Sequence, residues 1–147
     1  MNARAPVAAV GVVCFRGDDV LLVKRAKPPR QGEWSLPGGR IEWGERAIDA
    51  ALRELHEETG CSAEIVALAD VVDAVLRRRG EDESAEPWGH YLLVDYAARW
   101  TAGEPKAGDD AADARFFSPA EIAALGLWPE TLRVIEQARR LTAAVAP

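Results

Sequence analysis

One short stretch of the chain is rich in glutamate. A pair of glycines precedes these residues and a single glycine follows them. The segment from Gly38 to Cys61 reads GGRIEWGERAIDAALRELHEETGC. Its closely spaced charged side chains include Glu42, Glu45, Arg53, Glu54, Glu57 and Glu58. Carboxylate oxygens are hard ligands that suit Mg²⁺ or Mn²⁺. The residue types therefore indicate either a divalent-metal site or the solvated end of an acidic helix.

The spacing of Glu54, Glu57 and Glu58 favours the metal site. At about 100° per residue the three side chains share one face of a helix. Glu54 and Glu58 are four residues apart, and like charges at this spacing destabilise an isolated helix by about 0.2–0.5 kcal/mol. Both also lie towards the negative end of the helix dipole. The glycine pair, Gly38 and Gly39, adds to the argument, because a backbone without Cβ lets a carbonyl or amide approach an ion or a phosphate.

Length and charge limit the partners that these carboxylates could serve. The chain has 147 residues, which suits one domain spanning residues 1–147. A net charge of −6 without a basic stripe argues against a nucleic-acid partner. A phosphorylated small molecule remains compatible, because a divalent cation can stand between two anions.

The cysteines and the apolar runs predict a cytoplasmic protein with no membrane association. Cys14 and Cys61 match no zinc-binding spacing, so we expect two reduced, buried thiols. The apolar run Val7 to Phe15 is too short to span a bilayer and lacks a signal-peptide cleavage pattern.

The elements that must position the carboxylates follow from apolar patterning. Strands are expected over Pro6–Phe15, Val20–Lys24, Trp34–Leu36, Arg40–Trp43, Ser62–Leu76 (bent near Ala69), Trp88–Trp100 and Ala114–Phe117. Helices are expected over Gly44–Thr59, from a Ser118 cap to about Leu125, and over Pro129–Ala144. The first helix carries an apolar stripe of Ile48, Ala51, Leu52, Leu55 and Thr59. This order predicts an α/β fold in which helices cover both faces of a mixed sheet.

The segment Gly39 to Cys61 resembles the Nudix box, G-x5-E-x7-R-E-U-x-E-E-x-G-U, where U is a bulky aliphatic residue. The residues in register are Gly39, Glu45, Arg53, Glu54, Leu55, Glu57, Glu58 and Gly60. Cys61 departs from the pattern at the last position, where its small apolar side chain affects only packing. The flanking sequences LVKR and WSLPGG are also similar to the family.

The resemblance implies a Nudix-type α/β/α sandwich that binds divalent metal and cleaves a diphosphate. It implies metal ligation by Glu54, Glu58, Glu57 and the carbonyl of Gly38. It also implies a structural ion pair between Glu45 and Arg53, although Arg53 could instead contact phosphate. Cofactor Mg²⁺ (or Mn²⁺) would neutralise the diphosphate and lower the pKa of a bound water.

Hydrolysis also requires a group that accepts the proton of the attacking water. The resemblance places this base either in the box, at Glu57 or Glu58, or in the loop Glu104 to Asp113. In that loop Asp109 and Asp110 are the candidates, and a solvated turn is the alternative for both.

The substrate must be chosen by residues outside the box. Arg25 suits a phosphate but could be a surface cation. Trp34 and Trp43 flank the glycines, where base stacking and buried packing are both open and packing is favoured. The candidate substrate-binding residues are therefore Arg25, Trp34 and Gly39.

Similarity to the small bacterial ADP-ribose pyrophosphatase-like branch favours a nucleoside diphosphate linked to another moiety, with ADP-ribose first. A nucleoside triphosphate pyrophosphatase that clears damaged nucleotides is the alternative, and a non-catalytic nucleotide-binding regulator is an alternative of another class. The protein could form a homodimer. Its interface would then include exposed tryptophans such as Trp88, Trp100 and Trp128, which could equally lie in the core.

Overall fold

The computed structural model describes residues 4–28, 30–108 and 110–147. In chain order its elements are β1 (Val7–Arg16), β2 (Asp19–Arg25), β3 (Trp34–Ser35), β4 (Gly38–Arg40), α1 (Ala47–Thr59), β5 (Ser62–Leu76), β6 (Gly89–Ala102), β7 (Ala111–Phe117), α2 (Pro119–Ala124) and α3 (Pro129–Ala143). The elements follow the order expected from the sequence, and most of their ends lie within three residues of the expected bounds.

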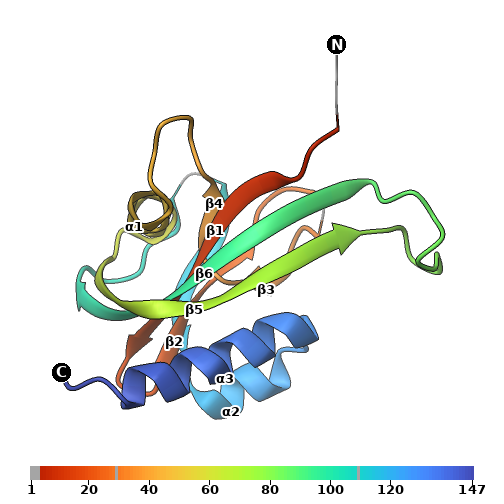
Figure 1. Ribbon diagram of the computed structural model, residues 1–147. Helices are drawn as coiled ribbons and strands as arrows, with labels where there is room; N and C mark the ends of the chain where they lie inside the picture. Colours follow the sequence, from red (N-terminus) through yellow and green to blue (C-terminus); the bar gives the residue numbers. More distant parts are fainter. Residues whose placement is uncertain (1–3, 29, 109) are drawn as a thin grey trace.

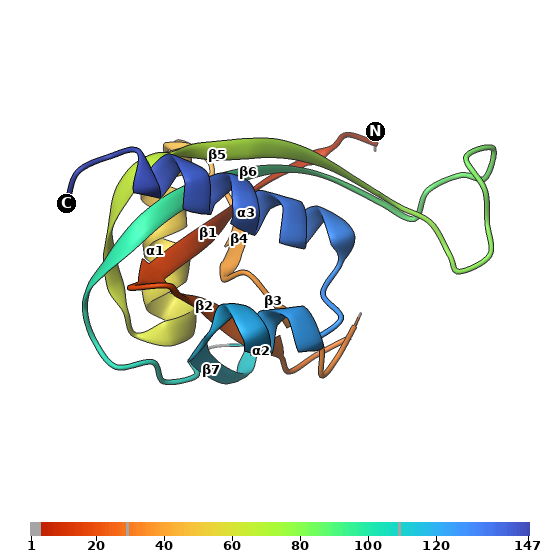
Figure 2. The same cartoon turned by 90° about the horizontal axis from the view of Figure 1, so that it is seen from below.

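The strands form one mixed sheet in the order β3-β2-β1-β6-β5, with β4 paired to β1 and β7 paired to β2. β1 and β6 run parallel, and the other pairs are antiparallel. Helix α1 covers one face, while α2 and α3 lie on the other (Figure 1). Figure 2 shows α3 crossing the face formed by β5 and β6. The far ends of these two strands and the loop that joins them extend beyond the rest of the sheet. The predicted mixed sheet between helices is confirmed.

Strand β1 changes its antiparallel partner along its length, and this opens the sheet. Residues 9–11 pair with β4, whereas Phe15 and Arg16 pair with β2. Pro37 bridges the change, since its carbonyl accepts a hydrogen bond of 3.0 Å from the amide of Val12. The space between β4 and β2 is therefore lined by backbone from several strands, and the candidate site lies there.

The core lies on both faces of β1, as its continuous apolar sequence predicts. Val13 and Phe15 pack with residues of β2, β5, β6, α2 and α3. Val12 and Cys14 pack on the opposite face with Leu55 and other residues of α1. Cys14 and Cys61 are both buried free thiols, as expected, and burial raises the pKa of Cys14 to about 12.

The expected strand over Arg40–Trp43 is wrong. The strand is the glycine pair with Arg40, because a Cβ at Gly38 would lie only 2.0 Å from the carbonyl oxygen of Val10. The chain then turns, with the amide of Glu45 donating to the carbonyl of Glu42 at 2.9 Å. Gly44 has a φ of 83°, so α1 begins at Ala47 and not at Gly44.

Helix α1 buries a slightly different stripe from the expected one. Ala50, Ala51, Leu55 and Thr59 are buried, whereas Ile48 and Leu52 are only half-buried. The helix ends at Gly60, which adopts the left-handed conformation with a φ of 72°. Ala50 lies one turn before Glu54 on the same side of the helix, so the buried stripe extends towards Glu54 and Glu58, and these glutamates are partly buried beside the opening of the sheet.

Two local predictions outside the site are confirmed. The hydroxyl of Ser118 accepts a hydrogen bond from the amide of Glu121, whose carboxylate accepts one from the amide of Ser118, so α2 has a capping box. β5 has a register shift between Leu68 and Asp70, where the bend was expected. No helix in the described ranges is long and apolar enough to cross a membrane.

Candidate active site

Arg53 ties the turn after β4 to helix α1. Its Nε and Nη2 atoms donate to the two carboxylate oxygens of Glu45, at 2.7 and 2.9 Å. Its Nη2 also donates to the carbonyl of Arg40 at 3.1 Å. These hydrogen bonds from Arg53 are the main reason that the pKa of Glu45 falls to about 2. Glu45 and Arg53 thus form a two-pronged ion pair that fixes the glutamate-bearing helix to the glycine strand.

Glu54 and Glu58 lie against the two glycines of β4. The amide of Gly38 donates to Oε1 of Glu58 at 3.1 Å. A Cβ at Gly39 would lie 2.7 Å from each carboxylate oxygen of Glu54, so only glycine leaves room for that group. Burial, reinforced by the charge of Glu54, raises the pKa of Glu58 to about 8. The two carboxyl groups are therefore a closely spaced, partly buried pair that resists carrying two negative charges.

Glu57 is linked to Glu54 through Arg53. Its carboxylate accepts a hydrogen bond of 3.1 Å from Nη1 of Arg53, which also donates to Glu54 at 2.8 Å. Across the described ranges, no group of three or more His, Cys, Asp or Glu side chains is placed to hold a metal ion. The Glu54–Glu58 pair nevertheless fits a hard divalent cation, because a cation would stabilise the ionised form of Glu58, which burial and then the charge of Glu54 disfavour.

These glutamates line a cavity of about 480 Å³, which we call the carboxylate cavity. Arg25, Lys27 and Asp110 line its other side. The carboxylate of Asp110 pairs with Nζ of Lys27 at 2.8 Å, and this hydrogen bond lowers the pKa of Asp110. Asp109 lies outside the described residues.

The loop before β7 is attached to the C-terminal end of α1. The amide of Gly108 donates to the carbonyl of Glu58 at 3.0 Å, and the amide of Lys106 donates to Thr59 at 2.9 Å. A Cβ at Gly108 would lie 2.4 Å from the carbonyl oxygen of Glu57, so the close approach requires glycine. These contacts hold Asp110 at the rim of the carboxylate cavity.

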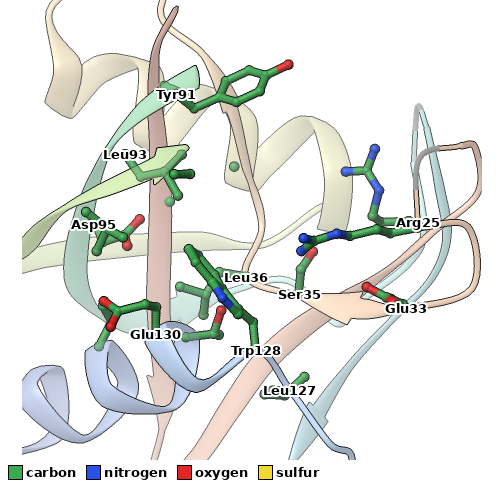
Figure 3. A pocket seen from close by; sticks show the side chains of 18 of the residues that line it. Arg25, Glu33, Ser35, Leu36, Tyr91, Leu93, Asp95, Leu127, Trp128 and Glu130 are labelled. Atoms are coloured by element: carbon green, nitrogen blue, oxygen red, sulfur yellow. The ribbon is translucent and has the colours of Figure 1, made fainter. Parts of the chain in front are cut away.

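A second cavity of about 820 Å³, the aromatic cavity, opens beside the first. Its aromatic lining comes from Trp34, Trp88, Tyr91 and Trp128. Figure 3 shows the side chains of Asp95 and Glu130 on one side, Arg25 on the other, and Trp128 between them. Both cavities are lined by Arg25, Ser35, Leu36, Gly38, Gly39 and Arg40, so they are contiguous. A molecule with an anionic end and a ring-bearing end could occupy both.

The two tryptophans beside the glycines differ. Trp34 is half-buried, lines the aromatic cavity and packs edge-on against Phe117 with ring centroids 4.7 Å apart. Trp43 is fully exposed and lines neither cavity, so the expectation that it packs in the interior is wrong. Trp43 lies in the turn that replaces the expected strand, and this turn points its side chain into solvent.

Sequence reasoning missed Asp95 and Glu130. Asp95 had a readable signal, since it is a lone carboxylate within the otherwise apolar run LLVDYAA of β6. Glu130 looked like an ordinary acidic residue in the first turn of a helix. Its position in the cavity depends on how α3 packs on the sheet.

The NUDIX domain profile matches residues 5–138, so the chain belongs to the NUDIX family. An ADP-ribose pyrophosphatase of Methanocaldococcus jannaschii is 36% identical over 112 residues, which are 76% of this chain and 62% of that protein. The 8-oxo-dGDP phosphatase NUDT18 of Mus musculus is 35% identical over 94 residues, 64% of this chain and 25% of that protein. The chain thus spans less than two thirds of the length of both relatives.

The fold is shared with a solved NUDIX domain, that of Shewanella oneidensis NrtR in a complex with ADP ribose. The two chains superpose with a TM-score of 0.75 at 27% identity, covering 94% of this chain and 89% of the other. The Nudix-type α/β/α architecture expected from the motif is therefore confirmed.

Proposed function

We propose that the protein is a divalent-cation-dependent hydrolase of the diphosphate bond in a nucleoside diphosphate linked to another moiety, with ADP-ribose favoured. The observation that carries this proposal is the continuity of the two cavities through Arg25 and the glycine strand. A diphosphate beside Glu54 and Glu58 would leave its nucleoside in the aromatic cavity.

The carboxylate cavity supplies the residues for cleavage. Glu54 and Glu58, with Glu57 and the carbonyl of Gly38, would hold Mg²⁺ or Mn²⁺. When bound, such an ion neutralises diphosphate charge and lowers the pKa of a water. Arg53 positions the helix through Glu45 and orients Glu57, rather than contacting phosphate.

Arg25 and Gly39 are proposed to contact the phosphates. Arg25 lines both cavities, so its guanidinium is positioned to bind an anionic oxygen between them. Gly39 leaves its backbone accessible beside Glu54. Trp34 would border the nucleoside, since it lines only the aromatic cavity.

The proton acceptor is proposed among Glu57, Glu58, Asp109 and Asp110. The ion pair with Lys27 lowers the pKa of Asp110 and makes it a weaker base. Glu57 and Glu58 both line the cavity, and Glu57 is the more open to solvent but pairs with Arg53, so the two box glutamates are equal candidates.

The comparisons are compatible with ADP-ribose and with damaged nucleotides as substrates. One relative is named for ADP-ribose hydrolysis, and the solved neighbour holds ADP ribose. A nucleoside triphosphate pyrophosphatase acting on damaged nucleotides is the second candidate, because another relative is named as an 8-oxo-dGDP phosphatase. A regulator that binds nucleotide without hydrolysis is disfavoured by the complete set of box glutamates.

We further propose a single domain over residues 1–147 that acts in the cytoplasm, without a nucleic-acid or membrane partner. Homodimer formation is proposed through exposed aromatic residues. Trp88 and Trp128 are partly exposed at the mouth of the aromatic cavity, whereas Trp100 donates its indole N–H to the carbonyl of Gly103 at 2.7 Å. The first two are therefore the better interface candidates.

The test is a substrate panel with product identification, run with and without Mg²⁺. Conversion of ADP-ribose to AMP and ribose 5-phosphate supports the first proposal. Conversion of a dNTP to dNMP and pyrophosphate supports the second candidate. Nucleotide binding without cation-dependent hydrolysis of any panel member overturns the enzyme proposal.

A further inference from the structure

Asp95 is a buried carboxylate whose environment leaves it without a protein partner. The residue is 5% exposed, and Thr59 is the other buried polar residue in the described part of the chain. Thr59 is satisfied, because its hydroxyl donates to the carbonyl of Leu55 and accepts from the amide of Cys61. For Asp95, no hydrogen bond or ion pair is found among residues 4–28, 30–108 and 110–147. Asp95 is not among the described side chains with a fully enclosed, unpartnered polar atom, so its oxygens open towards the cavity that Asp95 lines, and a ligand there could supply the missing partner.

The fold makes room for the Asp95 carboxylate rather than pairing it. Gly11 is the partner of Asp95 in the parallel β1–β6 register, and a Cβ on Gly11 would lie 2.3 Å from Oδ1 of Asp95. The antiparallel partner of Asp95 is Asp70, whose carboxylate pairs with Arg133 of α3. Arg133 is therefore engaged by a neighbouring carboxylate, and Asp95 has none of its own.

The carboxylate is directed into the aromatic cavity. Asp95 lines that cavity together with Glu130, and the two acidic side chains lie on the same side of it (Figure 3). Burial raises the pKa of Asp95 to about 6, so the group is mainly an acceptor at neutral pH. This side of the cavity thus offers hydrogen-bond acceptors and lies away from Arg25.

We propose that Asp95 selects the base of the substrate by accepting a hydrogen bond from an exocyclic amino group. This inference rests on the proposed function for the position of the diphosphate, and it names a specificity-determining residue for the same site. A ring stacked on Trp128 presents its edge to the side, and the polar atoms of a base lie along that edge. An amino group supplies the donor that Asp95 lacks.

The same geometry predicts rejection of a base that carries a keto oxygen in place of the amino group. A keto oxygen would face two carboxylates, Asp95 and Glu130, and leave Asp95 without its donor. Sites built to hydrogen-bond a ligand group reject analogues that lack it strongly, because a buried polar group is then left unpaired. Adenine and hypoxanthine differ in this way at C6, and the adjacent N1 accepts in adenine but carries a proton in hypoxanthine. Purine riboside 5′-monophosphate, which lacks only the amino group, is therefore included as a third probe that offers Asp95 no donor at either position.

The experiment compares AMP with IMP by calorimetric binding without metal, and ADP-ribose with its inosine counterpart by kcat/KM with Mg²⁺. Wild type is expected to prefer the amino base by about 10-fold or more in both measurements, the value of a hydrogen bond to a charged group. Asp95→Asn is expected to bring the two bases within about twofold, because an amide both donates and accepts.

Two variants separate base selection from a structural role. Asp70→Asn changes the adjacent carboxylate, which does not line the cavity, and should keep the base preference. Gly11→Ala keeps the Asp95 carboxylate but displaces it, and should weaken the preference. The inference is overturned if wild type does not discriminate the bases or if Asp95→Asn keeps the preference. Absence of hydrolysis with base-selective binding retained overturns the proposed reaction instead.

Discussion

The two contiguous cavities are built in opposite ways. The glutamates and glycines of the carboxylate cavity come from β4 and α1, within a segment of 21 residues from Gly38 to Glu58. The aromatic cavity draws on β1 to β6 and on α3, so its lining extends from Ala9 to Val134. The groups suited to cleavage are therefore encoded locally, and those suited to recognition are brought together only by the fold.

The two cavities also differ in whether their charged side chains have partners within the protein. In the carboxylate cavity Arg53 pairs with Glu45, Glu54 and Glu57, and Gly38 donates to Glu58. In the aromatic cavity Asp95 has no such partner among the described residues. One cavity is preorganised by its own hydrogen bonds, while the other leaves an acceptor for its ligand to satisfy.

The largest effect is expected from Gly39→Ala in the carboxylate cavity. The added Cβ would meet both oxygens of Glu54 at 2.7 Å and displace that side chain, leaving the backbone in place. We expect kcat for ADP-ribose to fall by about 100-fold, since small displacements of positioning groups have effects of that size. Steady-state kinetics measures the loss, and the circular dichroism spectrum should be unchanged. Gly89→Ala is the control, because its Cβ would meet only ordinary contacts of 3.4 Å or more.

The second largest effect is expected from a substitution in the aromatic cavity. Trp128→Ala should raise KM for ADP-ribose by about 10-fold through loss of base stacking, with kcat within about twofold. A fall in kcat as large as that expected for Gly39→Ala would contradict the assignment of recognition to the aromatic cavity and cleavage to the carboxylate cavity. Trp100→Ala, on β6 and outside both cavities, provides a matched indole deletion.

A smaller effect concerns stability and its dependence on pH. Burial, with the charge of Asp70, raises the folded-state pKa of Asp95 from 3.8 to about 6, while Arg133 opposes the shift. The ionised form is therefore disfavoured in the folded state, and stability is lost as pH rises from about 4 through 6. At pH 7.5 this amounts to about 3 kcal/mol, at about 1.4 kcal/mol per unit of pKa.

Asp95→Asn should consequently be more stable than wild type at pH 7.5, with the difference shrinking towards pH 4. Urea denaturation at several pH values measures it. Asp70, Arg133 and Glu130 are the other charged groups near Asp95, so Asp70→Asn is the control for their contribution. Equal stability of Asp95→Asn and wild type across this range would show that Asp95 is not an unpaired buried charge.

The smallest effect is predicted for Trp43→Ala. Trp43 is fully exposed and lines neither cavity, so the free energy of unfolding should change by less than about 0.5 kcal/mol. Kinetic constants should stay at wild-type values. Trp34→Ala, which removes the contact with Phe117, should destabilise the protein measurably in the same denaturation assay.

The difference between the two cavities also explains how far the sequence could be read. The box predicted the Glu45–Arg53 contact and the glycine backbone beside Glu54 and Glu58 because its spacing is fixed within one helix and one turn. It did not predict that Glu57 turns to Arg53, since side-chain pairing on a helix depends on the neighbouring turn. Strand propensity misplaced β4, because the close approach of Gly38 to Val10 is a tertiary requirement.

The aromatic cavity could not be derived from the sequence. Asp95 and Glu130 are 35 positions apart and converge only when α3 packs on β6. Trp34 and Trp43 are the same residue type on either side of the glycine pair, so the sequence does not distinguish their roles. In the structure Trp34 lines the cavity, whereas the turn at Gly44 leaves Trp43 exposed.

The most direct test of the account is Mg²⁺-dependent turnover of ADP-ribose by wild type and by Glu58→Gln, with AMP affinity measured on the same samples. The glutamine preserves an oxygen for the amide of Gly38 but cannot ionise to hold a cation. We predict that kcat falls by at least about 100-fold while AMP affinity stays within about twofold. Equal turnover by the two proteins would contradict the assignment of cleavage to the carboxylate cavity.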